Sequence, residues 1–166
     1  MILSKPGPRK QPSAIRCIEF IAQTHGYRVQ TRKQDRKTSP LEKKFLPDIV
    51  AQPHKGKTKR VFEVEATVTN NTIYKSLLSL LTSLKNPKVM AYLVVPDKKI
   101  EFANGCFQNL KSVVRYFSKS AKGAPPKIKL EILSFTQVAE HYAKAKKYED
   151  SDRIGQPPKC PFLPRV

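Results

Sequence analysis

Residues 60–68 of the chain read RVFEVEATV, and residues 46–51 read LPDIVA. Both segments are rich in apolar and β-branched residues and are separated by a turn-forming stretch, so they predict two neighbouring strands. Glu63 and Glu65 are two residues apart, so on a strand their side chains point to the same face. If the two strands pair as a hairpin, Asp48 can approach Glu63, and acidic side chains then gather at one place.

The segments around this pair alternate between helix and strand patterns. Helical periodicity covers residues 13–25, 72–85, 104–120 and 134–147, and further strands are predicted over residues 27–31, 89–95 and 127–133. The run over 89–95 is continuously apolar, which is typical of a strand buried on both faces. The order α-β-β-β-α-β-α-β-α predicts an α/β fold, in which helices cover a central sheet of mixed strand direction.

Neither end of the chain shows such periodicity. Residues 1–12 are basic and rich in proline, and residues 148–166 contain four prolines. Segments of this composition have little apolar surface to bury. We therefore expect a disordered basic tail over 1–12, one folded domain over 13–147, and a flexible proline-rich tail over 148–166.

The composition is strongly basic and predicts a polyanionic partner. The 166 residues include 32 Lys and Arg but only 13 Asp and Glu, for a formal net charge of +19. Such an excess of positive charge repels itself unless phosphates or counter-ions neutralise it. No stretch approaches the roughly 20 apolar residues of a membrane span. No P-loop or GxGxxG motif indicates a nucleotide cofactor, and Cys17, Cys106 and Cys160 form no CxxC pair that would indicate zinc or disulfides.

Basic side chains near the acidic strands are the candidates for contact with a nucleic-acid backbone. They are Arg32, Lys33, Lys55, Lys57, Lys59, Arg60, Lys111, Arg115 and Lys119. The last three recur every four residues and form a ridge on their predicted helix. For any one of these groups of basic residues, the alternative to phosphate contact is a solvated face that contributes only to solubility. The sequence contains no helix-turn-helix, zinc-finger or RNA-recognition motif that would read bases.

The acidic side chains of the predicted hairpin suggest a metal site. Carboxylates held close together repel one another unless they bind protons or a cation. Hard oxygen ligands suit Mg²⁺ or Mn²⁺, which could activate water beside a phosphodiester. The alternative is an ordinary amphipathic strand, with Phe62, Val64 and Ala66 inward and Glu63 and Glu65 in solvent. The scarcity of acidic residues elsewhere in the predicted core favours a site.

Pro47-Asp48, followed after a hairpin-length gap by Glu63-Val64-Glu65, resembles the motif of the PD-(D/E)XK nuclease superfamily. The resemblance extends to the element order and covers most of the predicted domain. It implies a restriction-endonuclease-like fold with an αβββαβ core and a Mg²⁺- or Mn²⁺-dependent endonuclease that cuts DNA.

The resemblance also implies roles for individual residues. Asp48 and Glu63 would be metal ligands. In archaeal Holliday-junction resolvases of this superfamily a Glu on the first helix supports the metal, and Glu19 is at the matching position. The alternative is that Glu19 is a solvated helix residue near Arg16. The third motif position is usually Lys but is Glu65 here, which removes a cation that stabilises developing charge. Glu65 would then act as a general base or a further ligand. Lys75 on the next helix could replace the cation, although its position on the helical wheel is that of a surface lysine.

Several functions fit these features. The resemblance implies a cytoplasmic, nucleoid-associated homodimer that cuts double-stranded or branched DNA, as junction resolvases, restriction enzymes or transposon nucleases do. One alternative is a catalytically degenerate member of the fold that only binds DNA. Another is an unrelated basic RNA-binding protein. Finally, one side of a predicted helix carries the small residues Thr72, Ser76, Ser79 and Ser83. This strip could be a dimer seam or a DNA-facing edge, but an ordinary polar face is expected.

Overall fold

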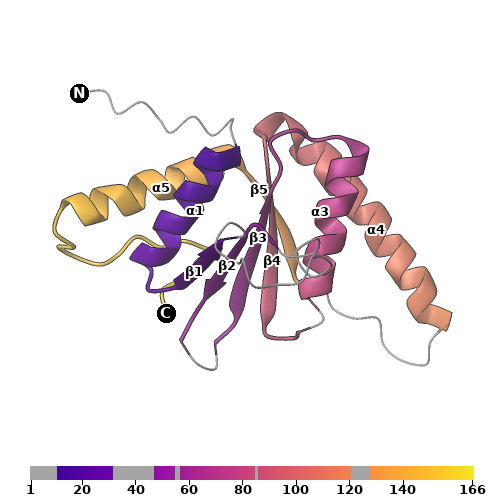
Figure 1. The fold of residues 1–166 in the computed structure, drawn as a ribbon, viewed down its shortest axis with the longest axis horizontal. Helices are drawn as coiled ribbons and strands as arrows, with labels where there is room; N and C mark the ends of the chain where they lie inside the picture. Colours follow the sequence, from indigo (N-terminus) through magenta and orange to yellow (C-terminus); the bar gives the residue numbers. More distant parts are fainter. Residues whose placement is uncertain (1–10, 32–46, 55–56, 85, 121–127) are drawn as a thin grey trace.

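A five-stranded mixed sheet lies between two pairs of helices (Figure 1). The computed structural model of the chain describes residues 11–31, 47–54, 57–84, 86–120 and 128–166. In chain order the elements are α1 (Gln11–Thr24), β1 (Arg28–Thr31), β2 (Ile49–Gln52), β3 (Lys59–Val64), α3 (Asn70–Ser83), β4 (Val89–Val95), a 3₁₀ turn (Asp97–Lys99), α4 (Ile100–Ser120), β5 (Leu130–Ser134) and α5 (Phe135–Asp150). The predicted α/β fold with a mixed central sheet is confirmed.

The strands follow one another across the sheet in sequence order, β1-β2-β3-β4-β5. The first three pair antiparallel, whereas β3, β4 and β5 run parallel to one another. Parallel neighbours need a crossover connection, and α3 and α4 provide these two crossovers. Both crossover helices cover the same face of the sheet, and α1 and α5 cover the other (Figure 1).

The interior strand β4 contributes to both layers of the core. Tyr92 and Val94 pack with α1 and α5, whereas Leu93 and Val95 pack with α3 and α4. All four side chains are fully buried. This confirms the prediction that the apolar run over 89–95 is a strand buried on both faces.

Side-chain capping fixes where two of the helices begin. Thr69 and Thr72 form a reciprocal capping box at the start of α3, and Ser134 and Gln137 form another at the start of α5. Each box satisfies backbone N–H groups that would otherwise lack partners in the first turn. The box at Ser134 is the one that the sequence predicts. Helix α1 begins at Gln11, and the predicted tail over 1–12 falls almost entirely outside the described residues.

The C-terminal residues are packed, so the prediction of a flexible tail over 148–166 is wrong. Helix α5 continues to Asp150, and Cys160, Phe162 and Leu163 are buried. The Phe162 ring meets the ring of Phe62 edge-on. Apolar side chains between prolines can fill a core without any repeating pattern, and proline restricts the unfolded chain so that less entropy is lost on packing.

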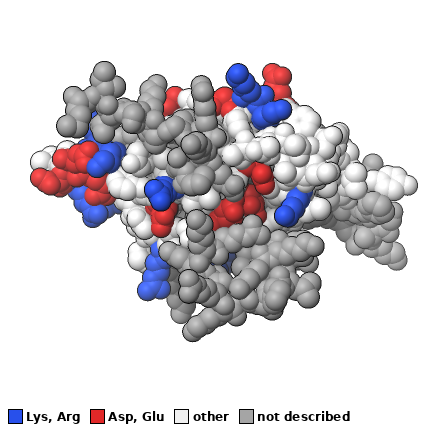
Figure 2. Space-filling model, turned by 45° about the horizontal axis from the view of Figure 1, so that its top comes forward, with Lys and Arg blue, Asp and Glu red and all other residues white. Residues whose placement is uncertain are grey.

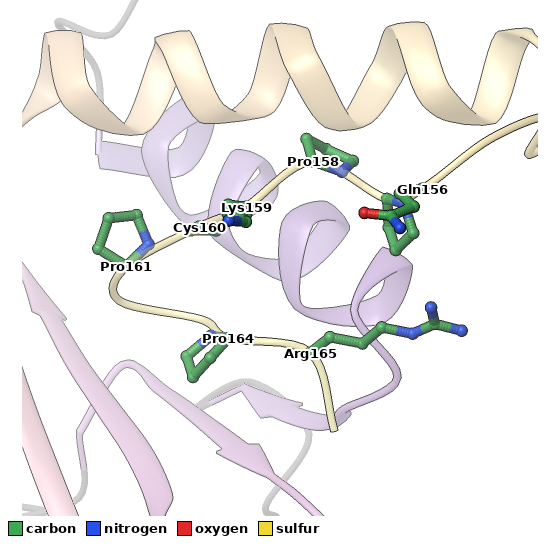
Figure 3. A pocket seen from close by; sticks show the side chains of 8 residues that line it. Gln156, Pro158, Lys159, Cys160, Pro161, Pro164 and Arg165 are labelled. Carbon is green, nitrogen blue, oxygen red and sulfur yellow. The ribbon is translucent and has the colours of Figure 1, made fainter.

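Hydrogen bonds attach this C-terminal segment to the end of α1 and the start of β1. The His25 ring nitrogen Nδ1 bonds the carbonyl oxygen of Leu163, and the Tyr27 hydroxyl donates to the carbonyl oxygen of Pro164 at 2.7 Å. The Val166 N–H donates to the carbonyl oxygen of His25. Figure 3 shows the segment from Gln156 to Arg165 running alongside α5 and across α1.

Within the described residues, none of the helices is long and apolar enough to cross a membrane.

Candidate functional site

Asp48 and Glu63 meet at one end of the β2–β3 hairpin. The strands are antiparallel with Ile49 opposite Phe62, and continuing this register places Asp48 opposite Glu63. Side chains at opposite positions of such a pair have Cβ atoms about 4.5–5.5 Å apart. Only 6% of Asp48 and 5% of Glu63 is exposed. The predicted hairpin pairing is confirmed, and it brings two acidic residues together in the protein interior.

Asp48 is held by the backbone of the neighbouring strand. Its Oδ2 atom accepts a hydrogen bond of 2.9 Å from the Val64 N–H. Asp48 directly precedes β2, so its carboxylate provides an acceptor for β3 where the regular β2–β3 ladder has ended. The side chain is therefore fixed in position by the same pairing that forms the hairpin.

Glu63 and Glu65 both face helix α3, as their spacing predicts. The Ser79 hydroxyl donates to Oε1 of Glu63 at 2.7 Å, and the Ser76 hydroxyl donates to Oε1 of Glu65 at 2.5 Å. Glu65 follows the end of β3 and is half-buried, and its N–H donates to the carbonyl oxygen of Val94. The two acidic residues therefore sit at the interface between the sheet and α3.

The structure contradicts the alternative of a simple amphipathic strand with its acidic residues in solvent. Val61, Phe62, Glu63 and Val64 are all buried, so β3 is covered on both faces. Burying a carboxylate is unfavourable unless hydrogen bonds replace its hydration. Glu63 is consequently a buried polar group with protein partners rather than a solvated surface residue.

The serine face of α3 was missed by the sequence analysis, which expects an ordinary polar face. Ser76 and Ser79 are 3% and 4% exposed. They lie among Ile73, Leu77 and Leu80, which form the buried apolar stripe of the helix. The sequence does contain a signal for these contacts. Ser76 and Ser79 are three residues apart beside the apolar stripe of their helix, and Glu63 and Glu65 share one face of the preceding strand, so each serine can reach one carboxylate.

Glu19 and Lys75 are not brought to the serine-bound face of the sheet. Glu19 is half-buried on α1, whose buried residues pack with the side of β3 formed by Phe62 and Val64. Lys75 is exposed on α3 while its neighbour Ser76 is turned inward. The metal-supporting role of Glu19 stays a prediction from the resemblance.

No group of three or more His, Cys, Asp or Glu side chains in the described ranges is arranged to hold a metal ion. The acidic side chains that the structure does bring together are Asp48 and Glu63, with Glu65 beside the same helix. Mg²⁺ needs only one or two protein carboxylates, because water and phosphate complete its shell. The pair formed by Asp48 and Glu63 satisfies that requirement.

The basic residues that are candidates for contact with nucleic acid differ in their solvent exposure and in their contacts within the protein. Lys57 and Arg115 are exposed, Lys59 is half-buried, and Lys111 lies over the Phe107 ring at 5.3 Å from its centroid. Arg60 is half-buried on the side of α1 and α5, where its Nη1 atom donates to the Tyr92 hydroxyl at 3.2 Å. The side chains of Arg32, Lys33, Lys55 and Lys119 lie outside the described residues.

One face of the molecule carries acidic atoms near its centre, with single basic side chains spread around them (Figure 2). A surface pocket of about 480 Å³ is lined by the C-terminal segment, including Pro158, Pro161 and Arg165 (Figure 3). That segment packs on the side of α1 and α5, so the pocket is separate from the carboxylates that face α3.

Comparisons with known proteins find no family model, no curated protein and no solved structure that matches this chain. What the protein does is therefore inferred from its own residues.

Proposed function

We propose that this protein is a divalent-metal-dependent DNA endonuclease. The observation that carries the proposal is the burial of Asp48 opposite Glu63 at the end of a hairpin, in a chain with a net charge of +19. Two carboxylates held close together in a basic protein would offer a divalent cation a pair of hard oxygen ligands, which supports the proposal. The element order α1-β1-β2-β3-α3-β4 also agrees with the αβββαβ core expected for this type of nuclease.

Asp48 and Glu63 are the residues that would hold Mg²⁺ or Mn²⁺. When bound, such an ion polarises a phosphoryl oxygen and promotes ionisation of an attacking water molecule. The protein holds both carboxylates in place, because Asp48 bonds the Val64 N–H and Glu63 accepts from Ser79. Hydrolysis forms a bond between the water oxygen and phosphorus and breaks one phosphoester bond.

In this proposal Glu65 would take the proton of the attacking water. Like Glu63, it faces α3. It occupies the motif position at which PD-(D/E)XK nucleases usually have Lys. A carboxylate there cannot stabilise negative charge as an ammonium does, but it can act as a general base. Exposed basic residues such as Lys57 and Arg115 would neutralise the phosphates of the bound DNA.

The substrate is double-stranded or branched DNA in the cytoplasm, where the protein would associate with the nucleoid. A small nuclease that cuts two strands usually works as a homodimer with two active centres, and each copy of the chain would contribute its Asp48 and Glu63. Two copies of the chain would supply the second centre. Since the sequence has no base-reading motif, the shape of the DNA rather than its sequence would select the substrate.

A DNA-binding protein without catalytic activity is the second candidate. The observation that favours it is Glu65 in place of the usual Lys, which leaves the site without its expected cation. Such a protein would bind DNA through the same exposed basic residues and would show no metal-dependent cleavage.

A cleavage assay separates the two candidates. Duplex, branched and single-stranded DNA are incubated with the protein and Mg²⁺ or Mn²⁺, and Asp48→Asn is compared with the wild type. Asparagine keeps an oxygen acceptor for the Val64 N–H but removes the charge. We expect Asp48→Asn to abolish cutting and retain DNA binding, whereas the control Glu131→Gln at an exposed position of β5 cuts normally. Cutting by Asp48→Asn at the wild-type rate would refute the assigned role.

A further inference from the structure

Two hydroxyl groups of α3 donate hydrogen bonds to carboxylates of the neighbouring sheet region. Serine and threonine in a helix commonly bond the carbonyl oxygen one turn earlier. Thr82 does so with Leu78, and Ser112 does so with Gln108. Ser79, by contrast, donates to Glu63 across the interface between helix and sheet.

The surroundings of these hydroxyl groups are apolar. Ile73, Leu77 and Leu80 of α3 are fully buried around Ser76 and Ser79. Alanine would fill the same space and has the highest helix propensity, so packing alone gives no reason for serine at two buried positions. What alanine lacks is a donor for the carboxylate oxygen.

A donated hydrogen bond restricts a buried carboxylate to one orientation. This restriction matters for a metal ligand, because a cation binds the carboxylate in a defined geometry. Ser79 therefore acts on Glu63, and Ser76 acts in the same way on Glu65.

We propose that Ser79 and Ser76 are positioning residues of the carboxylate site, which hold Glu63 and Glu65 in one orientation for a divalent cation and its water. This inference rests on the proposed function, because it assigns the two serines to the same site. Neither serine touches the reacting atoms. Their effect passes through the carboxylates that they bind.

The test measures Mn²⁺ binding by calorimetry and the Mn²⁺ concentration that gives half the maximal cleavage rate. We expect Ser79→Ala to weaken Mn²⁺ binding 10–100-fold, as loss of a hydrogen bond to a ligand does. We expect Ser76→Ala to cause a smaller change. Ser83→Ala is the matched control, since Ser83 is a half-buried serine at the end of the same helix.

The cleavage data separate positioning from a general loss of structure. With Ser79→Ala, saturating Mn²⁺ should restore the rate to within about threefold of wild type, because the carboxylate remains present. A structural defect would lower the rate at every Mn²⁺ concentration. If Ser79→Ala binds Mn²⁺ as tightly as Ser83→Ala, the positioning role is refuted and the nuclease proposal stands. If the wild type binds no Mn²⁺ even with DNA present, both fail.

Discussion

Phe162 lies edge-on against Phe62, with ring centroids 6.3 Å apart and ring planes at 80°. Phe62 belongs to β3 and directly precedes Glu63. The C-terminal segment therefore packs against the face of β3 that is covered by α1 and α5, whereas Glu63 lies on the opposite face, toward α3. A contact made near residue 162 supports the part of the sheet that forms the candidate site.

Truncating Phe162 should destabilise the whole fold. Its side chain is 2% exposed and also contacts the rings of Tyr92 and His141. Phe162→Ala should lower the free energy of unfolding by about 3–5 kcal/mol, as removal of a buried aromatic ring does. Urea denaturation followed by circular dichroism measures this. Ile154→Ala, at a side chain that is 80% exposed, is the control and should change stability by less than about 0.5 kcal/mol. A similar small change for Phe162→Ala would show that the C-terminal segment is not part of the core.

Stability should fall as the pH decreases below about 6.5 because of His141. Burial lowers the pKa of His141 below its ordinary value of 6.5, and nearby Lys144 and His25 lower it further, against the opposing effect of Glu140. The folded state thus binds a proton at this ring less readily than the unfolded chain does. Protonation on acidification therefore favours unfolding, beginning at the unfolded value and continuing down through the folded one.

The unfolding free energy at pH 7 and at pH 5.5 tests the role of His141. His141→Phe keeps an aromatic ring beside Phe162 but cannot titrate. The variant should lose less stability than the wild type between the two pH values. An equal loss in both proteins would assign the acid sensitivity to other groups.

Cys160 should react slowly with alkylating reagents while the protein is folded. Burial raises the pKa of its thiol from 9.0 to about 11, although hydrogen bonds from the backbone at Leu163 and Phe162 act in the opposite direction. A shift of this size leaves about 100-fold less thiolate at neutral pH, and the thiolate is the reactive form. Iodoacetamide labelling followed by mass spectrometry should show rapid modification only after unfolding. Rapid modification of Cys160 in the native protein would contradict the packing of the segment.

Substitutions of Lys57 and Arg60 should have different effects on the salt dependence of DNA binding. Lys57 is exposed, whereas Arg60 donates to the Tyr92 hydroxyl on the side of α1 and α5. Lys57→Gln should reduce the slope of log K against log salt by about 0.9, the amount expected for one phosphate contact. Arg60→Gln should instead lower stability and leave the slope unchanged. Fluorescence anisotropy with a labelled duplex measures the slope, and an unaltered slope for Lys57→Gln would exclude this residue from the interface.

Local patterns were sufficient to predict most of the sheet and its helices. The apolar run over 89–95 predicts a buried strand because both of its faces need cover, and Ser134 predicts a helix start because its capping partner is three residues away. The proximity of Asp48 and Glu63 was also predictable, since hairpin pairing follows from two neighbouring strands and a turn.

Other features depend on contacts between distant parts of the chain. The C-terminal segment has no periodicity, so Phe162 and Leu163 give no local sign that they enter the core. The inward orientation of Ser79 depends on its distance from Glu63, which lies 16 residues earlier. The position of Glu19 follows from which face of the sheet α1 covers, and the pattern of α1 alone does not specify that face.

The bond between His25 and Leu163 closes a loop of 138 residues. Closing so long a loop costs more chain entropy than forming a hairpin or a crossover unit, and non-local contacts of this type slow folding. Docking of the last residues should therefore be a late event, and their release should be among the first steps of unfolding. Phe162 packs against Phe62, which directly precedes Glu63 in β3. The acidic pair should therefore become fully rigid only when the C-terminal segment docks, late in folding.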